Sequence, residues 1–365
     1  MMPTKKNHIP LFHLTKRDPA TLTWQYRLGV RIAAVVGGLL MAGLLMTILS
    51  GENILDVYAS MVDGVFGTSH RVWTSLQSVA MLLCVSLAVT PAFKMKFWNI
   101  GAEGQVLVGG LACAACMMFL GSELPLPLLL VVMALASILA SVIWAVIPAV
   151  FKAFWNTNET LFTLMMNYVA TQLVAYFLKV YIKDGSGVMP VMKQYGLPVI
   201  GGNDYLLNVL ITIALTVVLY IYLKYSKQGY EISVVGESEN TARYIGINVK
   251  KVIIRTLAVS GIICGITGFL LVGATSHTIS TTTVGGRGFT AILVSWLAKF
   301  NPLVMALTAF LVVFLETGAG QLNTDFGIPS EVSDIMTGII LLSIIGCEFF
   351  LQYRIAVRKN RKEEA

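Results

Sequence analysis

Residues 126–150 read LPLLLVVMALASILASVIWAVIPAV and carry no charged side chain. About 20 apolar residues in a helix cross the roughly 30 Å hydrocarbon core of a bilayer. Further uncharged apolar runs occur at residues 32–48, 206–223, 257–274 and 302–315. Repeated runs of this length predict an all-α polytopic membrane protein.

The composition supports the same class. Only 12% of the 365 residues are charged, against about 25% in an ordinary soluble domain. This length has room for about ten transmembrane helices, although eight or nine full crossings stay open because the eighth expected span is short. The expected spans lie near residues 30–50, 73–91, 99–120, 126–150, 159–180, 206–224, 256–275, 288–299, 302–318 and 332–350.

The polar residues divide the chain into three regions. We expect a cytoplasmic amino-terminal tail at 1–29, a transmembrane domain at 30–350 and a basic cytoplasmic tail at 351–365. The first tail does not resemble a secretory signal peptide, because the apolar run after it is long enough to span and no small-residue cleavage site follows. The longest inside loop is expected at 225–255. These features place the chain in a membrane.

The basic residues predict the orientation. With the amino terminus inside and ten spans, all but five of the 26 Lys and Arg residues fall on the cytoplasmic side. The five on the outside are Arg71, Lys179, Lys183, Lys193 and Arg287. This asymmetry follows the positive-inside rule and puts both termini in the cytoplasm. It also accounts for the net charge of +7 without nucleic acid as a partner.

The sequence contains few residues in patterns that are typical of an enzyme active site. The sequence contains no H-E-x-x-H zinc motif, no G-x-S-x-G nucleophile elbow and no G-x-x-x-x-G-K-[ST] phosphate loop. All five cysteines fall in apolar runs, which argues against disulfides. Cys113 and Cys116 are three residues apart in one span and are interpreted as helix packing, not as metal ligands. Gly261, Gly265 and Gly268 are likewise expected to pack closely against another helix.

The loop at 225–255 has internal order. Gly236 follows the apolar pair Val234–Val235 and breaks the apolar stretch there. Ser238 is a suitable cap for a short helix that ends at Tyr244. Gly246 stands where a left-handed residue stops a helix. The short helix is either a capped connector or a docking point for a cytoplasmic partner, whose anchors are commonly aromatic and Arg residues.

Two glycine-flanked charges stand out. Residues 97–105 read FWNIGAEGQ, in which Asn99 is a suitable helix cap and Glu103 falls in the first turn. Residues 285–288 read GGRG and repeat the glycine–x–charge–glycine form around Arg287. The two motifs open the third and the eighth expected spans. They suggest a possible 5+5 inverted repeat, in which paired Gly-interrupted segments point to a binding site.

These segments resemble a known family. Residues 97–109 are similar to a motif in the permease subunits of bacterial ATP-binding-cassette (ABC) importers for nucleosides and simple sugars. The resemblance continues, in order, from about residue 30 to residue 350. Further matching segments are Asn158–Thr160, Leu164–Tyr168, Val235–Glu237, Ala242–Ile247, Gly285–Phe289, Leu293 and Asn301–Pro302.

The resemblance implies a place in the cytoplasmic membrane of a bacterium and an assembly of several subunits. A second permease subunit, often a different chain in this family, would complete the pore. Cytoplasmic ABC ATPases would grip the helix after Ser238, and an extracytoplasmic substrate-binding lipoprotein would deliver the solute. This chain would then be no enzyme and bind no cofactor, because ATP is used by the partner. The residues implied in ATPase coupling are Gly236, Glu237, Ala242, Arg243, Tyr244 and Gly246.

We therefore expect a transport subunit that imports a nucleoside or a related simple sugar, surrounded by membrane lipid. Neutral solutes need hydrogen-bonding groups and apolar walls. A monosaccharide or branched-chain amino acid ABC permease is the nearest alternative, and an ion-coupled secondary transporter is an alternative of another class. A bulky residue at Gly236 or an acidic one at Arg243 is expected to uncouple transport without unfolding the chain. The candidates for the solute path are Asn99, Glu103, Gln105, Glu159, Asn167 and Arg287.

Overall fold

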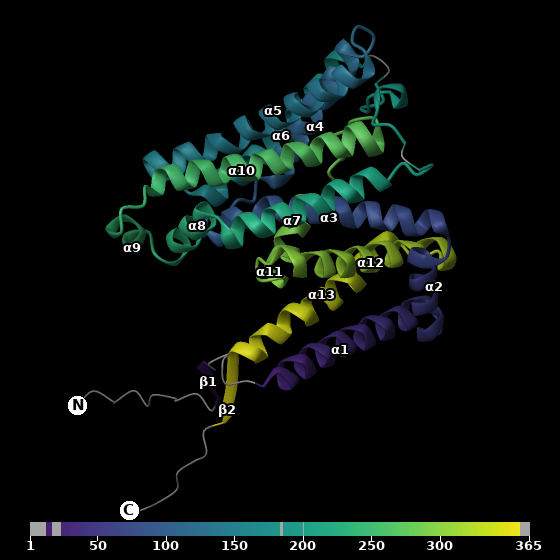
Figure 1. Cartoon of the computed structure of the whole chain (residues 1–365). Helices are drawn as coiled ribbons and strands as arrows, with labels where there is room; N and C mark the ends of the chain where they lie inside the picture. The colour runs from purple at the N-terminus through teal and green to yellow at the C-terminus, as the bar shows by residue number, and fades with distance from the viewer. Residues whose placement is uncertain (1–11, 17–22, 183–184, 200, 358–365) are drawn as a thin grey trace, which may run out of the picture. The chain divides into compact units, whose positions relative to one another are not determined.

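The computed structural model describes residues 12–16, 23–182, 185–199 and 201–357, and these form helices almost throughout (Figure 1). Most of the two predicted tails lies outside the described residues. The all-α polytopic class is confirmed. The helices are α1 (Trp24–Ser50), α2 (Ile54–Phe66), α3 (Ser69–Lys94), α4 (Ala102–Leu120), α5 (Leu126–Trp155), α6 (Glu159–Tyr181), α7 (Leu206–Tyr225), α8 (Lys227–Glu237), α9 (Glu239–Tyr244), α10 (Val249–Leu270), α11 (Arg287–Leu297), α12 (Pro302–Phe326) and α13 (Ser330–Gln352), with a 3-10 turn η2 (Lys193–Tyr195) and a π-helical turn η3 (Leu271–Ser276).

Eight helices in the described part of the chain are long and apolar enough to cross a membrane. They match eight of the ten expected spans, and α10 with η3 makes the longer continuous span Val249–Ser276. The expected spans at 288–299 and 332–350 correspond to the shorter apolar helices Arg287–Leu297 and Ile335–Leu351. At about 1.5 Å per residue, α11 covers only about half of the hydrocarbon core.

The chain divides into two units, one of residues 68–314 and one of residues 1–67 with 315–365. In the larger unit α10 packs against α3, α4 and α5, and α4, α5, α6 and α10 run side by side (Figure 1). A side chain at Gly265 would meet the Ile138 Cα of α5 at 2.5 Å, and one at Gly268 would meet the Gly110 nitrogen of α4 at 2.7 Å. Close packing at this glycine stripe is confirmed.

Serine hydroxyls join the same three helices. Ser137 on α5 donates to the Gly265 carbonyl at 2.7 Å, and Ser141 donates to the Gln105 carbonyl on α4 at 2.7 Å. Both serines are fully buried. Small polar residues that bond across helices stabilise membrane bundles, where water is absent.

The smaller unit holds α1, α2 and α13. A side chain at Gly38 of α1 would meet Ser343 of α13 at 2.9 Å, so these two helices pack closely. Two short strands, β1 (Phe12–Lys16) and β2 (Tyr353–Val357), pair antiparallel. The sequence did not indicate these strands. Their pairing brings residues 12–16 and 353–357 together, and the cytoplasmic position of both ends stays a prediction.

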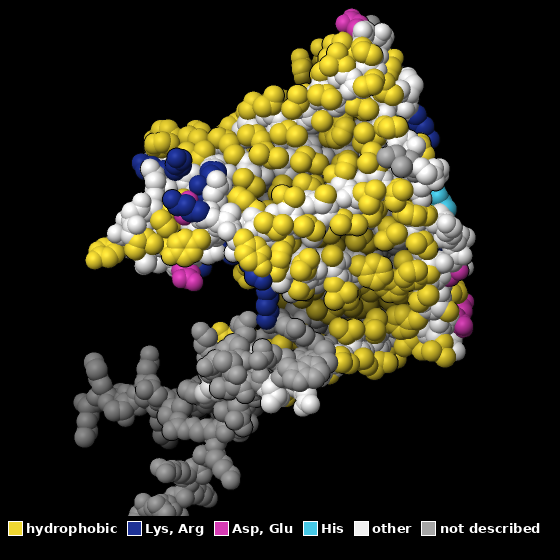
Figure 2. Space-filling model, viewed as in Figure 1, with side chains coloured by type: hydrophobic (Ala, Val, Ile, Leu, Met, Phe, Trp, Pro, Cys, Tyr) yellow, Lys and Arg dark blue, Asp and Glu magenta, His cyan; other side chains and the backbone are white. Residues whose placement is uncertain are grey.

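The surface is that of a membrane protein. Hydrophobic side chains cover most of the face in Figure 2, and the charged ones gather toward the helix ends. Aromatic side chains are exposed at the carboxyl ends of α5 (Phe151, Phe154 and Trp155) and α7 (Tyr225), but along the middle of both helices the large exposed side chains are aliphatic. They are Leu128, Val131, Leu135, Leu139 and Ile143 on α5 and Leu210, Ile213, Val217, Val218 and Ile221 on α7.

Candidate functional site

The turn between α3 and α4 is pinned inside the bundle by Asn99, which is fully buried. Its Oδ1 accepts hydrogen bonds from the Gly101 nitrogen and from Gln105 Nε2, each at 3.1 Å. Its Nδ2 donates to Ser260 Oγ on α10 at 3.3 Å. The prediction that Asn99 caps α4 is wrong, because the cap position is Gly101. Asn99 instead closes a turn two residues before that cap.

Asn167 holds the start of α4 from the side of α6. Its Oδ1 accepts from the Gly104 nitrogen and its Nδ2 donates to the Ile100 carbonyl, both at 2.9 Å. Thr163, one turn earlier on α6, accepts from the Ile100 nitrogen at 3.2 Å. A side chain at Gly104 would meet Asn167 Oδ1 at 2.8 Å, so the glycine is required for this contact.

Glu103 joins the two glycine-flanked motifs. Its carboxylate accepts from the Gly286 nitrogen at 2.8 Å and from the Gly288 nitrogen at 2.6 Å. These are free backbone donors of the first turn of α11, where the helix dipole favours a negative charge. A side chain at Gly288 would meet the Glu103 nitrogen at 2.5 Å. The half-length α11 and the first turn of α4 therefore meet end to end, with one carboxylate between them.

The structure brings five of the six candidate path residues into this region. Asn99, Gln105 and Asn167 are buried and bonded to the protein itself. Arg287 is the first residue of α11 and is close enough to attract the Glu103 carboxylate.

The sixth candidate, Glu159, lies elsewhere. It begins α6 and forms an ion pair with Lys152 of α5 at 2.9 Å. The geometry thus gives all six candidates contacts that hold the fold, whatever contact they make with a solute.

The loop at 225–255 begins with a helix that the sequence did not indicate. α8 runs from Lys227 through Gly236 to Glu237, so Gly236 does not interrupt the structure there. A side chain at Gly236 would meet the Lys94 carbonyl at 2.2 Å, which shows that α8 lies directly against the end of α3. Arg255 of α10 forms an ion pair with Glu231 of α8 at 2.8 Å.

The predicted short helix follows as α9. Ser238 Oγ accepts from the Thr241 nitrogen at 3.2 Å, and Gly246 has a φ of 84°, so both ends are as expected. Ala242 is fully buried against the protein, whereas Tyr244 is 92% exposed. Hydrophobic side chains at this tip lie near a group of basic ones (Figure 2). α9 therefore presents an exposed tyrosine on a short helix whose other side is packed against the protein.

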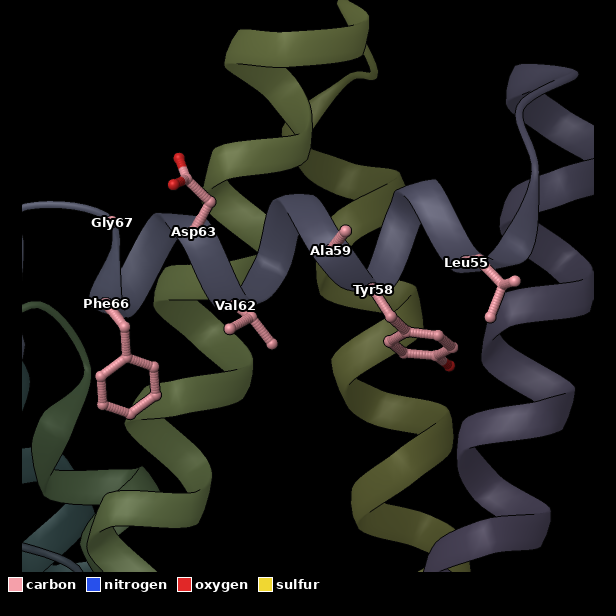
Figure 3. A pocket seen from close by; sticks show the side chains of 7 residues that line it. All are labelled: Leu55, Tyr58, Ala59, Val62, Asp63, Phe66 and Gly67. Atoms are coloured by element: carbon pink, nitrogen blue, oxygen red, sulfur yellow. The ribbon is translucent and has the colours of Figure 1, made fainter.

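A shallow hollow lies on α2 in the smaller unit (Figure 3). Leu55, Tyr58, Val62 and Phe66 point to one side of the helix, and Asp63 points to the other. A helix of 13 residues with one apolar and one polar face suits a position at the membrane surface. The hollow has few polar groups and is a poor solute site.

The sequence reasoning overlooked the exposed face of α6. Tyr168 and Tyr176 are 62% and 67% exposed, and Gln172 between them is exposed as well. The available signal was their spacing of four residues, which places them on one helical face. α6 also has the lowest hydropathy of the eight candidate spans.

Comparison with known proteins gives a consistent result. Residues 71–345 match the family model described as branched-chain amino acid transport system / permease component. The guanosine ABC transporter permease protein NupP of Bacillus subtilis is 29% identical over 327 residues, covering 86% of this chain and 91% of NupP.

Two further relatives match over most of their length. The nucleoside ABC transporter permease protein NupB of Lactococcus lactis is 24% identical over 349 residues, covering 91% of this chain and 94% of NupB. The glucose ABC transporter permease protein TsgB13 of Haloferax volcanii is 26% identical over 349 residues, covering 92% of this chain and 91% of TsgB13.

Proposed function

The chain belongs to the family of branched-chain amino acid transport system permease components, and we propose that it is the membrane subunit of an ABC importer for a nucleoside. It is a multi-pass membrane protein whose energy comes from a separate ATPase. The observation that carries the proposal is α9, a short helix with Tyr244 92% exposed on a firmly packed base. An exposed aromatic of this kind is a typical anchor for a protein partner.

The support under α9 suits the transmission of force. α8 packs directly on the end of α3 at Gly236, and the Arg255–Glu231 ion pair ties α8 to α10. Ala242 is buried on the packed side of α9. A push on Tyr244 would therefore move α3 and α10, which form the core of the larger unit, without first bending a loose loop.

The relatives support a neutral, hydroxyl-rich solute. Two of them are named for nucleosides and one for glucose. We favour a nucleoside, and a simple sugar is the second candidate because the glucose permease matches over a similar length. Both classes bind through hydrogen bonds and apolar contacts without a fixed countercharge.

The partners follow from the family. We propose a cytoplasmic ABC ATPase bound at α9, a second permease subunit that is a different chain, and a binding lipoprotein outside. An ion-coupled carrier acting alone is the competing function, and it needs no ATPase.

Uptake by the assembled importer tests the proposal. The chain is produced with its second permease, ATPase and binding protein in cells that lack nucleoside uptake, and radiolabelled guanosine, uridine, glucose and leucine are supplied. We expect saturable guanosine or uridine uptake that disappears when the phosphate-loop Lys of the ATPase is replaced. Uptake that survives this replacement and stops when the ion gradient is removed would favour an ion-coupled carrier. Uptake of leucine alone would refute the proposal that the solute is a nucleoside.

A further inference from the structure

We infer that Tyr168, Gln172 and Tyr176 of α6 line the solute path and contact the nucleoside directly. This inference rests on the proposed function. It assigns a contact surface that is separate from the buried amides of Asn99, Gln105 and Asn167.

The three side chains occupy the middle of one helical face. The opposite face of α6 is buried through Thr163, Asn167, Ala170, Val174 and Leu178. At 100° per residue, Gln172 and Tyr176 fall opposite the centre of that buried face. Gln172 is 13 residues from Glu159 and nine from Tyr181, or about 20 Å and about 14 Å along the helix axis. The amide therefore stands at hydrocarbon depth.

The hydrocarbon of a bilayer is an unfavourable environment for these three side chains of α6. All three side chains are exposed. Within the described part of the chain, the hydroxyl groups of Tyr168 and Tyr176 and the side-chain amide of Gln172 form no hydrogen bond with another residue. A polar group without a partner in hydrocarbon is strongly disfavoured. Along the middle of α5 (residues 128–143) and of α7 (residues 210–221), the large exposed side chains are all aliphatic, as a lipid-facing surface should be. The polar face of α6 thus requires a different environment.

A closely packed partner helix also fits poorly. Helices that approach one another in membranes use small residues at the contact, as α10 does at Gly261 and Gly265. The exposed side of α6 instead presents Met165 at 52%, Tyr168 at 62% and Tyr176 at 67% exposure, beside the aliphatic Leu161, Val169 and Leu173. Side chains of this size hold a neighbouring helix backbone at a distance, and on this inference the solute path runs through the space between them.

The chemistry matches a nucleoside. Tyrosine rings offer a flat surface on which a base can stack, whatever its hydrogen-bonding pattern. The Gln172 amide both donates and accepts, as base edges and ribose hydroxyls require. Tyr168 and Tyr176 are about 12 Å apart along the axis with Gln172 midway. No charged side chain lies between them, which suits a neutral solute.

Cysteine accessibility in the assembled importer tests the assignment. The five native cysteines are first replaced, and the resulting chain is checked for uptake. Gln172→Cys and, as a matched control, Leu139→Cys on the aliphatic face of α5 are then treated in membranes with a hydrophilic thiol reagent. We expect Gln172→Cys to react at least tenfold faster than Leu139→Cys, and guanosine supplied with the binding protein to slow the reaction.

Equal, slow labelling of both variants would overturn the inference, since it is the result expected if lipid or a partner helix covers α6. Labelling of Gln172→Cys that is fast but unaffected by guanosine in an importer that takes guanosine up would overturn the direct contact. The labelling rate measured without any solute does not depend on which solute is carried. An importer without nucleoside uptake therefore refutes the proposed function separately.

Uptake by side-chain variants gives a second readout. Gln172→Leu and Tyr176→Leu should lower nucleoside uptake at least tenfold with unchanged amounts of permease in the membrane. Tyr176→Phe keeps the ring and should retain more uptake than Tyr176→Leu. Normal uptake by both leucine variants would contradict the inference.

Discussion

At the scale of the residue, Glu103 carries a contact that its neighbours in the sequence could not reveal. The glycine-flanked motif marked it as unusual, and its place in the first turn of α4 is confirmed. Its partners, the Gly286 and Gly288 nitrogens, are backbone groups that look alike in any sequence. The two motifs were compared as a possible repeat, and the repeat stays a prediction, but their direct contact was not foreseen.

Glu103→Ala should destabilise the protein by about 3 kcal/mol, because two half-buried backbone donors of α11 lose a charged acceptor. Thermal unfolding of the purified permease in detergent measures the change. Glu123→Gln, at an exposed position, is the matched control and should stay within about 0.5 kcal/mol of the wild type. Equal stability of Glu103→Ala and the control would refute the capping role.

His277, which directly follows η3, should make the stability of the protein sensitive to acid. Burial lowers the pKa of His277, Lys193 lowers it further and Asp204 opposes both. A lowered pKa means that folding favours the neutral ring. Its stabilising contribution is therefore complete above the unfolded value of about 6.5 and is lost as pH falls toward the folded pKa.

The measurement is the unfolding temperature at pH 7.5 and at pH 5.5. His277 has a φ of 51°, a conformation that Asn tolerates, so His277→Asn is the suitable variant. The drop between the two pH values should be smaller in His277→Asn than in the wild type. An equal drop would show that other groups govern the response.

At the scale of the element, long apolar runs predicted the helices well, whereas short or polar segments were misread. α8 begins with Lys-Gln-Gly-Tyr-Glu, which looks like a loop because its stability comes from packing on α3 and from the Glu231–Arg255 ion pair. α11 was counted as the eighth of ten expected spans and noted as short, and only 11 of its residues are helical. β1 and β2 depend on pairing across more than 300 residues, which no local pattern encodes.

α9 should transmit force through Tyr244. Tyr244→Ala is expected to leave the unfolding free energy within about 0.5 kcal/mol, because the side chain is an exposed one. ATP-driven uptake should nevertheless fall at least tenfold, while Tyr244→Phe should retain most of it. Full uptake by Tyr244→Ala would count against the docking role.

The sequence predicts that a bulky residue at Gly236 uncouples transport without unfolding the chain, and the structure argues against this test. A bulky residue there would meet the Lys94 carbonyl at 2.2 Å, so a folding defect would mask any uncoupling. Arg243 pairs with Glu239 on the exposed surface at 3.2 Å, and the acidic substitution Arg243→Glu remains a usable second test of the coupling helix.

The α5–α10 contact should be sensitive to a single methyl group. Gly265→Ala is expected to destabilise the protein by about 1–3 kcal/mol, because overpacking would force two helix backbones apart. The control is Gly320→Ala in α12, where a side chain meets nothing within 4 Å, and there alanine should be neutral or slightly stabilising. Comparable unfolding temperatures for the two variants would disprove close packing at Gly265.

At the scale of the whole molecule, the all-α membrane class follows from physics that is visible in the sequence. A bilayer demands long apolar helices, and eight of the predicted ones are present in the described chain. The interior of the bundle was less accessible to sequence reasoning. Asn99, Gln105 and Asn167 were chosen as candidates for the solute path because they are polar, yet they hold the fold from within.

The central claim is that this chain is a gate operated from the cytoplasm through α9. Labelling of Thr241→Cys, an exposed position on α9, in a cysteine-free chain tests it most directly. In intact cells a membrane-impermeant thiol reagent should leave Thr241→Cys unmodified, and the same reagent should modify it fully once the cells are permeabilised. Modification in intact cells would place α9 outside, where no ATPase can reach it, and would contradict the account.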